Sequence, residues 1–143
     1  MKRLLLSLSA MIFCSPSLAA EKSMHSGITS LQIAKSSETI SGQTIAVPQN
    51  PDVTVSIVEI PSGSIIPPHK HPSARYGYVL NGALSVTNLV TGTVRKFKQG
   101  DFIIESIDQW HEGRNIGTSP TKLLVIDQTE RGKANTIFET HPG

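Results

Sequence analysis

The chain has 143 residues, 17% of them charged, and a formal net charge of +2 at pH 7 with histidine neutral. This length suits one compact domain and not two. The two surplus basic residues, Lys2 and Arg3, lie at the very start, so the rest of the chain is electrically neutral. A neutral chain gives no electrostatic case for binding nucleic acid or an anionic membrane, and we expect neither partner.

Residues 1–19 have the organisation of a secretory signal peptide. Basic residues precede a mostly apolar stretch, residues 4–13, which is too short to span a bilayer. Small residues then occupy the positions that a signal peptidase reads, ending at Ala19. The alternative is a buried N-terminal helix. A lipid anchor at Cys14 is not expected, because the phenylalanine before it is too large, so we predict a secreted or periplasmic chain, residues 20–143, without a membrane anchor.

From about Thr29 the sequence predicts strands rather than helices. Turn residues recur roughly every eight to twelve positions, as in all-β sandwiches and barrels. The clearest strand is 53–60, which is rich in β-branched residues and ends at a proline. Further strands are predicted at 76–80, 83–89, 95–98, 102–105 and 121–126.

The segments between and after these strands support three expectations. Asn81-Gly82 predicts a type I′ hairpin, in which both central residues have positive φ. The charged strand 95–98 is expected at a sheet edge, where its charges discourage pairing with another chain. Residues 130–143 are polar, so we expect a surface tail or a segment laid over a neighbouring subunit, and we expect the chain to form a homodimer.

Two histidines, His69 and His71, lie in a stretch that Pro67 and Pro68 keep extended. Residues i and i+2 of a strand point to the same face, so both imidazoles can converge on one metal ion. A third nitrogen has to come from another strand. His111 is the available candidate, because the remaining histidines lie near the two ends of the predicted mature chain.

These histidines stand in two spaced motifs that resemble those of the cupin superfamily. The first motif, G-x5-H-x-H-x3-E-x6-G, is matched by Gly63, His69, His71 and Gly82, with Arg75 in the glutamate position. The second, G-x5-P-x-G-x2-H-x3-N, is matched by Gly100, His111 and Asn115, with Ser106 and Asp108 in the proline and glycine positions. The spacing is kept throughout, and the resemblance covers residues 63–115.

The resemblance implies a fold and a metal site. The fold is all-β, a single cupin β-barrel of the jelly-roll double-sheet type over residues 20–143. The site is mononuclear, with His69, His71 and His111 as ligands of one divalent ion. Imidazole suits Fe, Ni, Cu and Zn, and Mn is a further candidate, so the sequence leaves the identity of the metal open.

Arg75 departs from the family pattern, because a guanidinium has no lone pair with which to bind a metal ion. Three outcomes are open. Arg75 turns outward, or it pairs with an acid and an anionic substrate group, or the metal is lost and the pocket binds ligand only. We expect one of the first two, and we predict that the paired acid is Glu105, which precedes His111. The alternative for Glu105 is an exposed carboxylate at a strand end.

The function expected from the resemblance is that of a secreted metal-binding cupin acting on a small organic molecule. If it is an enzyme, dioxygenase or isomerase chemistry is expected, with Glu105 as catalytic acid or base and Arg75 as substrate-binding residue. Cys14 is the only cysteine, so the mature chain has no disulfide and no thiol nucleophile, and a cysteine cross-linked thiol oxygenase is excluded. The alternative is a non-catalytic module that binds a small anion or sugar acid, which Arg75 favours.

Overall fold

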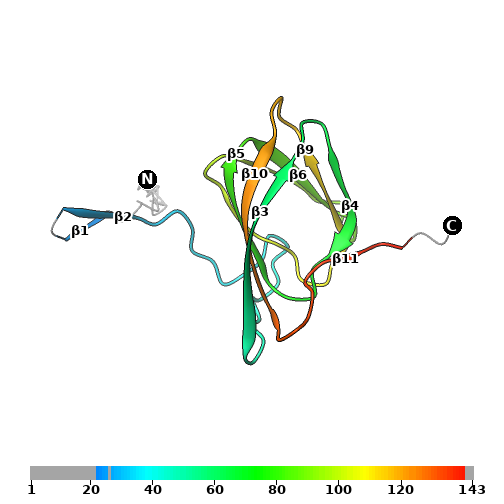
Figure 1. Ribbon diagram of the computed structural model, residues 1–143, viewed down its shortest axis with the longest axis horizontal. Helices are drawn as coiled ribbons and strands as arrows, with labels where there is room; N and C mark the ends of the chain where they lie inside the picture. Colours follow the sequence, from blue (N-terminus) through cyan, green and yellow to red (C-terminus); the bar gives the residue numbers. More distant parts are fainter. Residues whose placement is uncertain (1–21, 26, 141–143) are drawn as a thin grey trace, which may run out of the picture. The chain divides into compact units, whose positions relative to one another are not determined.

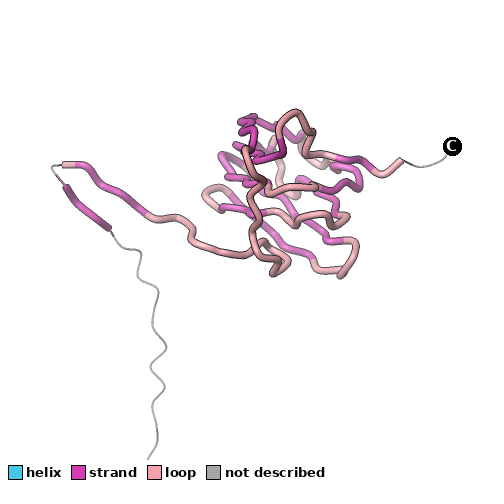
Figure 2. The backbone as a smooth tube through the Cα atoms, turned by 90° about the horizontal axis from the view of Figure 1, so that it is seen from below, coloured by secondary structure: helices cyan, strands magenta, loops and turns pink. Residues whose placement is uncertain are grey.

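The structure is a computed structural model that describes residues 22–25 and 27–140. The predicted signal peptide, residues 1–19, lies outside the described part of the chain. Strands joined by turns and loops make up the described residues, and none of these residues belongs to a helix long and apolar enough to cross a membrane (Figures 1 and 2). The predicted all-β fold class is confirmed.

The chain divides into two compact units, Met1–Gln32 and Ile33–Gly143. In the first unit, β1 (Lys22–His25) and β2 (Ile28–Leu31) form an antiparallel hairpin. In the second unit, the four-stranded sheet has the order β3-β10-β5-β8, made by β3 (Pro51–Ile60), β10 (Thr121–Glu130), β5 (Arg75–Asn81) and β8 (Phe102–Ile104). The five-stranded sheet has the order β11-β4-β9-β6-β7, made by β11 (Ile137–Phe138), β4 (Ile65–Lys70), β9 (His111–Asn115), β6 (Ala83–Asn88) and β7 (Val94–Lys98). These two sheets form the predicted jelly-roll double sheet.

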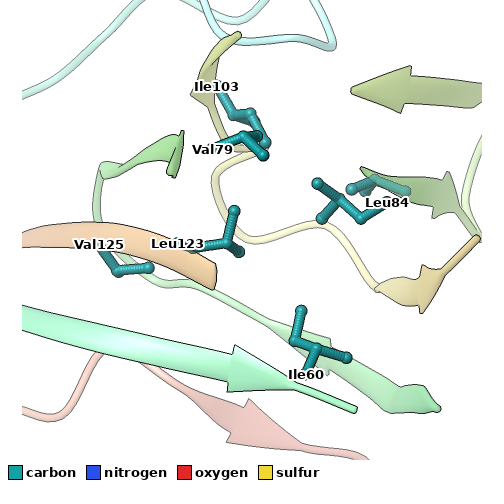
Figure 3. Packing of buried hydrophobic residues seen from close by; sticks show 7 residues of the cluster. Ile60, Val79, Leu84, Ile103, Leu123 and Val125 are labelled. Atoms are coloured by element: carbon teal, nitrogen blue, oxygen red, sulfur yellow. The ribbon is translucent and has the colours of Figure 1, made fainter. Parts of the chain in front are cut away.

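The apolar core lies between the two sheets and follows from strand alternation. In β10 every second residue from Thr121 to Thr129 is buried, while the residues between them are half-buried or exposed. Aliphatic side chains from both sheets meet in one cluster that contains Ile60, Val79, Leu84, Ile103, Leu123 and Val125 (Figure 3). Burial of one such side chain stabilises the fold by about 1.5–3 kcal/mol. The cluster therefore holds the sheets together and fixes which residues of each strand face inward.

The hairpin predicted at Asn81-Gly82 is wrong. β5 and β6 belong to different sheets, so Gly82 is a corner at which the chain passes from one sheet to the other. Gly82 has φ +85°, whereas Asn81 does not have positive φ. A Cβ atom on Gly82 would lie 2.5 Å from Oγ1 and 2.8 Å from Cα of Thr121. Glycine is required here by the close approach of β10 as well as by the turn.

Two further expectations concern the ends of the five-stranded sheet. β7, which contains the charged stretch 95–98, is an edge strand as predicted. The expectation that residues 130–143 form a surface tail or cover a neighbour is wrong for their central part. β11 pairs with β4 of the same chain (Figure 1). Asn135, just before β11, is only 6% exposed. This segment packs on its own barrel, beside the strand that carries His69 and leads to His71.

Candidate metal centre

Two neighbouring strands bring the three predicted histidines together. His69 in β4 and His111 in β9 are direct cross-strand partners in the five-stranded sheet. His71 follows β4 and is held by a bridge to Ile107. All three side chains are buried, and their ring centroids lie between 4.4 and 5.0 Å apart. The structure therefore gathers in one place the histidines that the sequence selects.

Pro67 and Pro68 lie inside β4, directly before His69. Proline has no N–H to donate to a neighbouring strand, and the β4–β9 pairing shifts register between Ile66 and His69. The Pro67 carbonyl instead accepts a hydrogen bond from His69 Nδ1 at 2.7 Å. The backbone stays extended through both prolines, which keeps the two histidine side chains directed into the barrel.

Each imidazole uses its Nδ1 atom to reach a backbone carbonyl. The distances are 2.7 Å from His69 to Pro67, 2.8 Å from His111 to Gln109 and 2.6 Å from His71 to Asn135. A carbonyl oxygen only accepts hydrogen bonds, so Nδ1 carries a proton in all three rings. In the neutral form each ring therefore offers the lone pair of Nε2, which is the arrangement found in metal-binding histidines.

Glu105, which directly follows β8, joins the histidines. Its Oε2 lies 3.2 Å from His71 Nε2 and 3.1 Å from His111 Nε2. The ligand atoms of His69, His71, Glu105 and His111 all lie within 4.8 Å of one another. Three nitrogens and one oxygen at this spacing fit one ion with ligand distances of about 2.0–2.2 Å. The side chain of Glu105 is 14% exposed, so the alternative of an exposed strand-end carboxylate is wrong.

The charges in this cluster are strongly coupled. Burial opposes the charge of Glu105, but hydrogen bonds with His111 and His71 hold the pKa of its carboxyl well below the ordinary range. Burial likewise opposes the charge of His111, but the hydrogen bond and negative charge of Glu105 raise its pKa above 6.5. Burial lowers the pKa of His69 to about 4. Without a metal ion these shifts favour an ionised Glu105, a protonated His111 and a neutral His69.

Arg75 pairs with Asp127, and the predicted ion pair between Arg75 and Glu105 is wrong. Arg75 and Asp127 face each other in register on β5 and β10, with Nε–Oδ1 and Nη2–Oδ2 distances of 2.7 and 2.8 Å. This bidentate geometry is the strongest that a guanidinium and a carboxylate form. The side chain of Arg75 is 17% exposed, so it has not turned outward to solvent. Its Nη1 lies 3.4 Å from His71 Nε2, at the edge of the histidine cluster.

Sequence reasoning did not select Asp127, Asn135 or Thr136. Burial opposes the charge of Asp127, but hydrogen bonds from Arg75 and Asn135 lower its pKa. Thr136 Oγ1 accepts a hydrogen bond from Arg75 Nη2 at 3.0 Å. Asp127 did have a signal, because it shares the inward side of β10 with the apolar residue Val125. Asn135 and Thr136 had no such signal, since they stand in a polar segment without periodicity.

A cavity of about 300 Å³ adjoins the histidine cluster. Its polar end is lined by His69, Arg75, Glu105, His111 and Thr136. The remaining wall is apolar and includes Ile66, Leu84, Val125 and Phe138. A cavity of this size, apolar with a few convergent polar groups, is typical of sites that take a small organic molecule.

The chain matches the Cupin domain family model over residues 56–127, which is just over half of its length. The protein belongs to the cupin family. No curated protein matches this cupin. The match to the family model confirms the fold expected from the two spaced motifs.

Solved structures with the same fold come from several organisms. One is an uncharacterized conserved protein with a double-stranded beta-helix domain from Klebsiella pneumoniae, with 24% identity, a TM-score of 0.53, and coverage of 73% of this chain and 82% of the other. Another is the Schizosaccharomyces pombe Cnp3 cupin domain, with 21% identity, a TM-score of 0.51, and coverage of 61% and 64%. A third is the DMSP lyase DddQ from Ruegeria pomeroyi, with 21% identity, a TM-score of 0.52, and coverage of 60% and 42%. At these identities the likeness concerns the fold, and this cupin spans less than two thirds of the last two chains.

One of the two departures in the second motif, Asp108, has a backbone conformation that suits a glycine position. Asp108 stands in the glycine position and takes φ +52°, a left-handed conformation that glycine adopts without strain. Its N–H donates to the carbonyl of His71 at 2.7 Å. Asn115 is 2% exposed, and its amide donates to the carbonyls of Ile60 and Ser119. Asn115 therefore bonds to backbone at the end of its strand and ties β9 to the end of β3.

Proposed function

We propose that this cupin is an exported protein that holds one divalent metal ion on His69, His71, Glu105 and His111, beside a cavity for a small organic molecule. The observation that carries the proposal is the orientation of the three rings. Their Nε2 atoms and the ionised Glu105 carboxylate face a common point. Four electron-rich groups at this spacing repel one another unless protons or a cation lie between them. The donor set suits Fe, Mn, Ni, Cu or Zn.

Glu105 restores a carboxylate that the family pattern expects from the position of Arg75. The acid now comes from the segment after β8 rather than from β5, and reaches the same histidines. A divalent ion together with Glu105 leaves one positive charge, because Asp127 already neutralises Arg75. A site with one surplus positive charge in a half-apolar cavity favours a ligand with a carboxylate or enolate group and an apolar body. Nη1 of Arg75 is the guanidinium nitrogen nearest the cluster, and it supports the role of Arg75 as substrate-binding residue.

The activity that we propose is dioxygenase or isomerase chemistry on such a ligand. When bound, the metal ion supplies Lewis acidity or one-electron chemistry. Glu105 is held ionised by its histidine neighbours, which suits a metal ligand and makes it a weak base when the metal is absent. The apolar walls exclude water from the ligand. The fold of the Ruegeria pomeroyi lyase supports catalysis within a barrel of this kind.

A second candidate is a non-catalytic module for a small anion or sugar acid. It is supported by Arg75, whose guanidinium lines the cavity in a position where the family pattern has a metal ligand. The bidentate pair with Asp127 weakens this candidate, because it leaves little unbalanced positive charge on Arg75. Stoichiometric metal in the purified protein supports the first candidate, and anion binding by a folded, metal-free protein supports the second.

Export and dimer formation belong to the same proposal. Residues 1–19 support export, and an intact Met1 on protein recovered from the cell interior would contradict it. The edge strand β3 exposes Val53, Val55 and Ile57 at 59–60% each, whereas the edge strand β7 carries three basic residues. Residues 53–58 of this ten-residue edge strand carry no charge, which supports pairing with a second copy. Light scattering that gives the mass of a monomer would contradict the dimer.

The metal proposal is tested by comparing His111→Ala with Glu112→Ala. The two residues are neighbours in β9 with side chains on opposite faces. Loss of one nitrogen ligand is expected to weaken metal binding by at least about 100-fold, since even residues that only orient ligands contribute about 10–100-fold. Glu112→Ala is expected to keep one equivalent, measured by elemental analysis after reconstitution. Equal metal content in the two variants, or none in the wild type, contradicts the proposal.

A further inference from the structure

The three histidines are not oriented in the same way. His69 and His111 each donate Nδ1–H to a carbonyl two residues earlier in the chain, so their own strands set the orientation of their rings. His71 donates instead to the carbonyl of Asn135, which is 64 residues away, at 2.6 Å. The orientation of one of the three rings therefore depends on a segment from the C-terminal end of the barrel.

Asn135 is anchored by its side chain as well as by this carbonyl. Its Nδ2 donates to Asp127 Oδ1 at 2.6 Å, and its Oδ1 accepts the backbone N–H of Ser73 at 2.9 Å. The residue is 6% exposed, so these bonds are shielded from water. One side chain thus joins the end of β10 to the turn after His71, and both anchors hold the carbonyl against the imidazole.

The residues after Asn135 fasten the same segment to the metal-binding strand. Phe138 pairs in register with His69, with ring centroids 5.8 Å apart. The N–H of Glu139 donates to the carbonyl of Pro68 at 3.0 Å. Residues 135–139 therefore form a strap along β4, and two of its side chains, Thr136 and Phe138, line the cavity.

We propose that Asn135 is a positioning residue for the metal centre, and that it acts by holding the His71 ring with Nε2 directed at the other ligands. This inference rests on the proposed metal-binding function, because it assigns a residue to the same site. Loss of the Asn135 side chain removes both anchors of the carbonyl. The His71 ring then becomes free to rotate, while the rings of His69 and His111 keep their local bonds.

The test uses the full mature chain with Asn135→Ala, and Asn81→Ala as matched control. Asn81 also donates through its side chain to a carbonyl, that of Pro120, but it is exposed and outside the site. The first measurement is binding of Zn²⁺ against a competing chelator, with the spectrum of the Co²⁺-loaded protein as a readout of coordination geometry. Asn135→Ala is expected to weaken Zn²⁺ binding about 10–100-fold and to alter the Co²⁺ spectrum. Asn81→Ala is expected to change neither.

The second measurement is made by NMR on the metal-free protein, as the exchange rate of each Nδ1–H proton with water. In Asn135→Ala the His71 proton is expected to exchange about tenfold faster, while those of His69 and His111 stay unchanged. Equal acceleration of all three protons would indicate general loosening and overturn the proposal, as would no change in any of them. If the wild type binds no metal, the proposed function fails, and this measurement still decides the role of Asn135.

A variant that keeps the shape of the residue covers the case in which Asn135→Ala does not fold. Asn135→Asp retains the acceptor for Ser73 but places a carboxylate against Asp127 in place of the amide donor. It is expected to accelerate exchange of the His71 proton selectively and to weaken Zn²⁺ binding. Wild-type behaviour of this variant in both measurements would overturn the proposal.

Discussion

Two acids face the interior of the barrel, and their surroundings differ in one decisive respect. Asp127 has a permanent counter-charge, because the Arg75 guanidinium binds it through two nitrogens. Among the residues that the structure describes, the Glu105 side chain pairs only with imidazoles, those of His71 and His111 at 3.2 and 3.1 Å. An imidazole is charged only when protonated, so the charge of Glu105 is balanced either by protons or by a metal ion.

The comparison separates a structural ion pair from a binding site. The Arg75–Asp127 pair is complete within the chain and needs no ligand. The charge of the Glu105 cluster is balanced only when protons or a metal ion are added. Although Arg75 replaces the glutamate of the first motif, Glu105 still supplies a carboxylate to the site. It follows that substitution of the two acids should affect different properties of the protein.

The largest effect is expected from Glu105→Gln. The amide keeps the shape of the side chain but removes the negative charge and leaves a weaker ligand. Metal affinity should fall by about 100-fold or more, since direct ligands contribute more than the 10–100-fold of residues that orient them. Above the raised pKa of His111, where the rings are neutral, metal-free stability should change little, because the amide can still hydrogen-bond to the rings. Competition with a chelator measures the first property and urea unfolding the second. A large loss of stability with unchanged affinity would reverse the comparison.

Asp127→Asn should show the opposite pattern. It leaves the Arg75 guanidinium, 17% exposed, without its counter-charge. Breaking such a pair by removing one partner costs about 2–3 kcal/mol of unfolding free energy at this degree of burial. Urea unfolding of the metal-free protein measures the loss. The double variant Arg75→Met/Asp127→Asn, in which neither charge remains, should recover part of it, and a double variant less stable than the single one would contradict the pairing.

The sequence predicted the histidine cluster because the information is local. His69 and His71 owe their common direction to strand alternation, and His111 stands at the expected place in the second motif. The same reasoning placed Glu105 in the pocket, because the strand before it leads directly to His111. Spacing along one strand determines a side chain's direction, so these residues could be found without coordinates.

The partners of these residues could not all be found in this way. The pairing of Arg75 with Asp127 depends on the register between β5 and β10, which are far apart in the sequence. The contact of His71 with Asn135 depends on a polar segment that has no pattern of its own. The corner at Gly82 has the residues of a hairpin, but its two strands join different sheets and β10 packs against it at Thr121. Long-range register, rather than local preference, decided each of these outcomes.

A pH series should sharpen the difference between the two acids. The pKa of Glu105 is lowered and that of His111 is raised, so their pair stabilises the metal-free protein most between about pH 4.5 and 6.5. This stabilisation is lost as the pH rises through the raised pKa of His111. Metal affinity should change in the opposite direction, because His111 must lose its proton to bind the ion. The pKa of Asp127 is lowered from 3.8, so its contribution should stay constant above that pH and fall only at lower pH.

Unfolding free energy and metal affinity measured from about pH 5 to 9 test this expectation. The wild type is compared with Glu105→Gln, in which the pKa of His111 is no longer raised. The variant should bind metal more weakly at every pH, but the pH below which its affinity starts to fall from the plateau should be lower than in the wild type. Identical pH profiles for the two proteins would show that Glu105 does not control the protonation of His111.

The smallest effect is expected where an acid and a base pair in solvent. Asp108 and Lys70 are 2.7 Å apart, but Asp108 is 65% exposed, so water screens the interaction. Asp108→Asn makes the same chemical change as Asp127→Asn, and asparagine also tolerates the φ of +52° found at this position. The unfolding free energy should change by less than about 0.5 kcal/mol, because exposed pairs contribute little. A loss at Asp108 as large as that at Asp127 would mean that burial is not what makes the Arg75–Asp127 pair important.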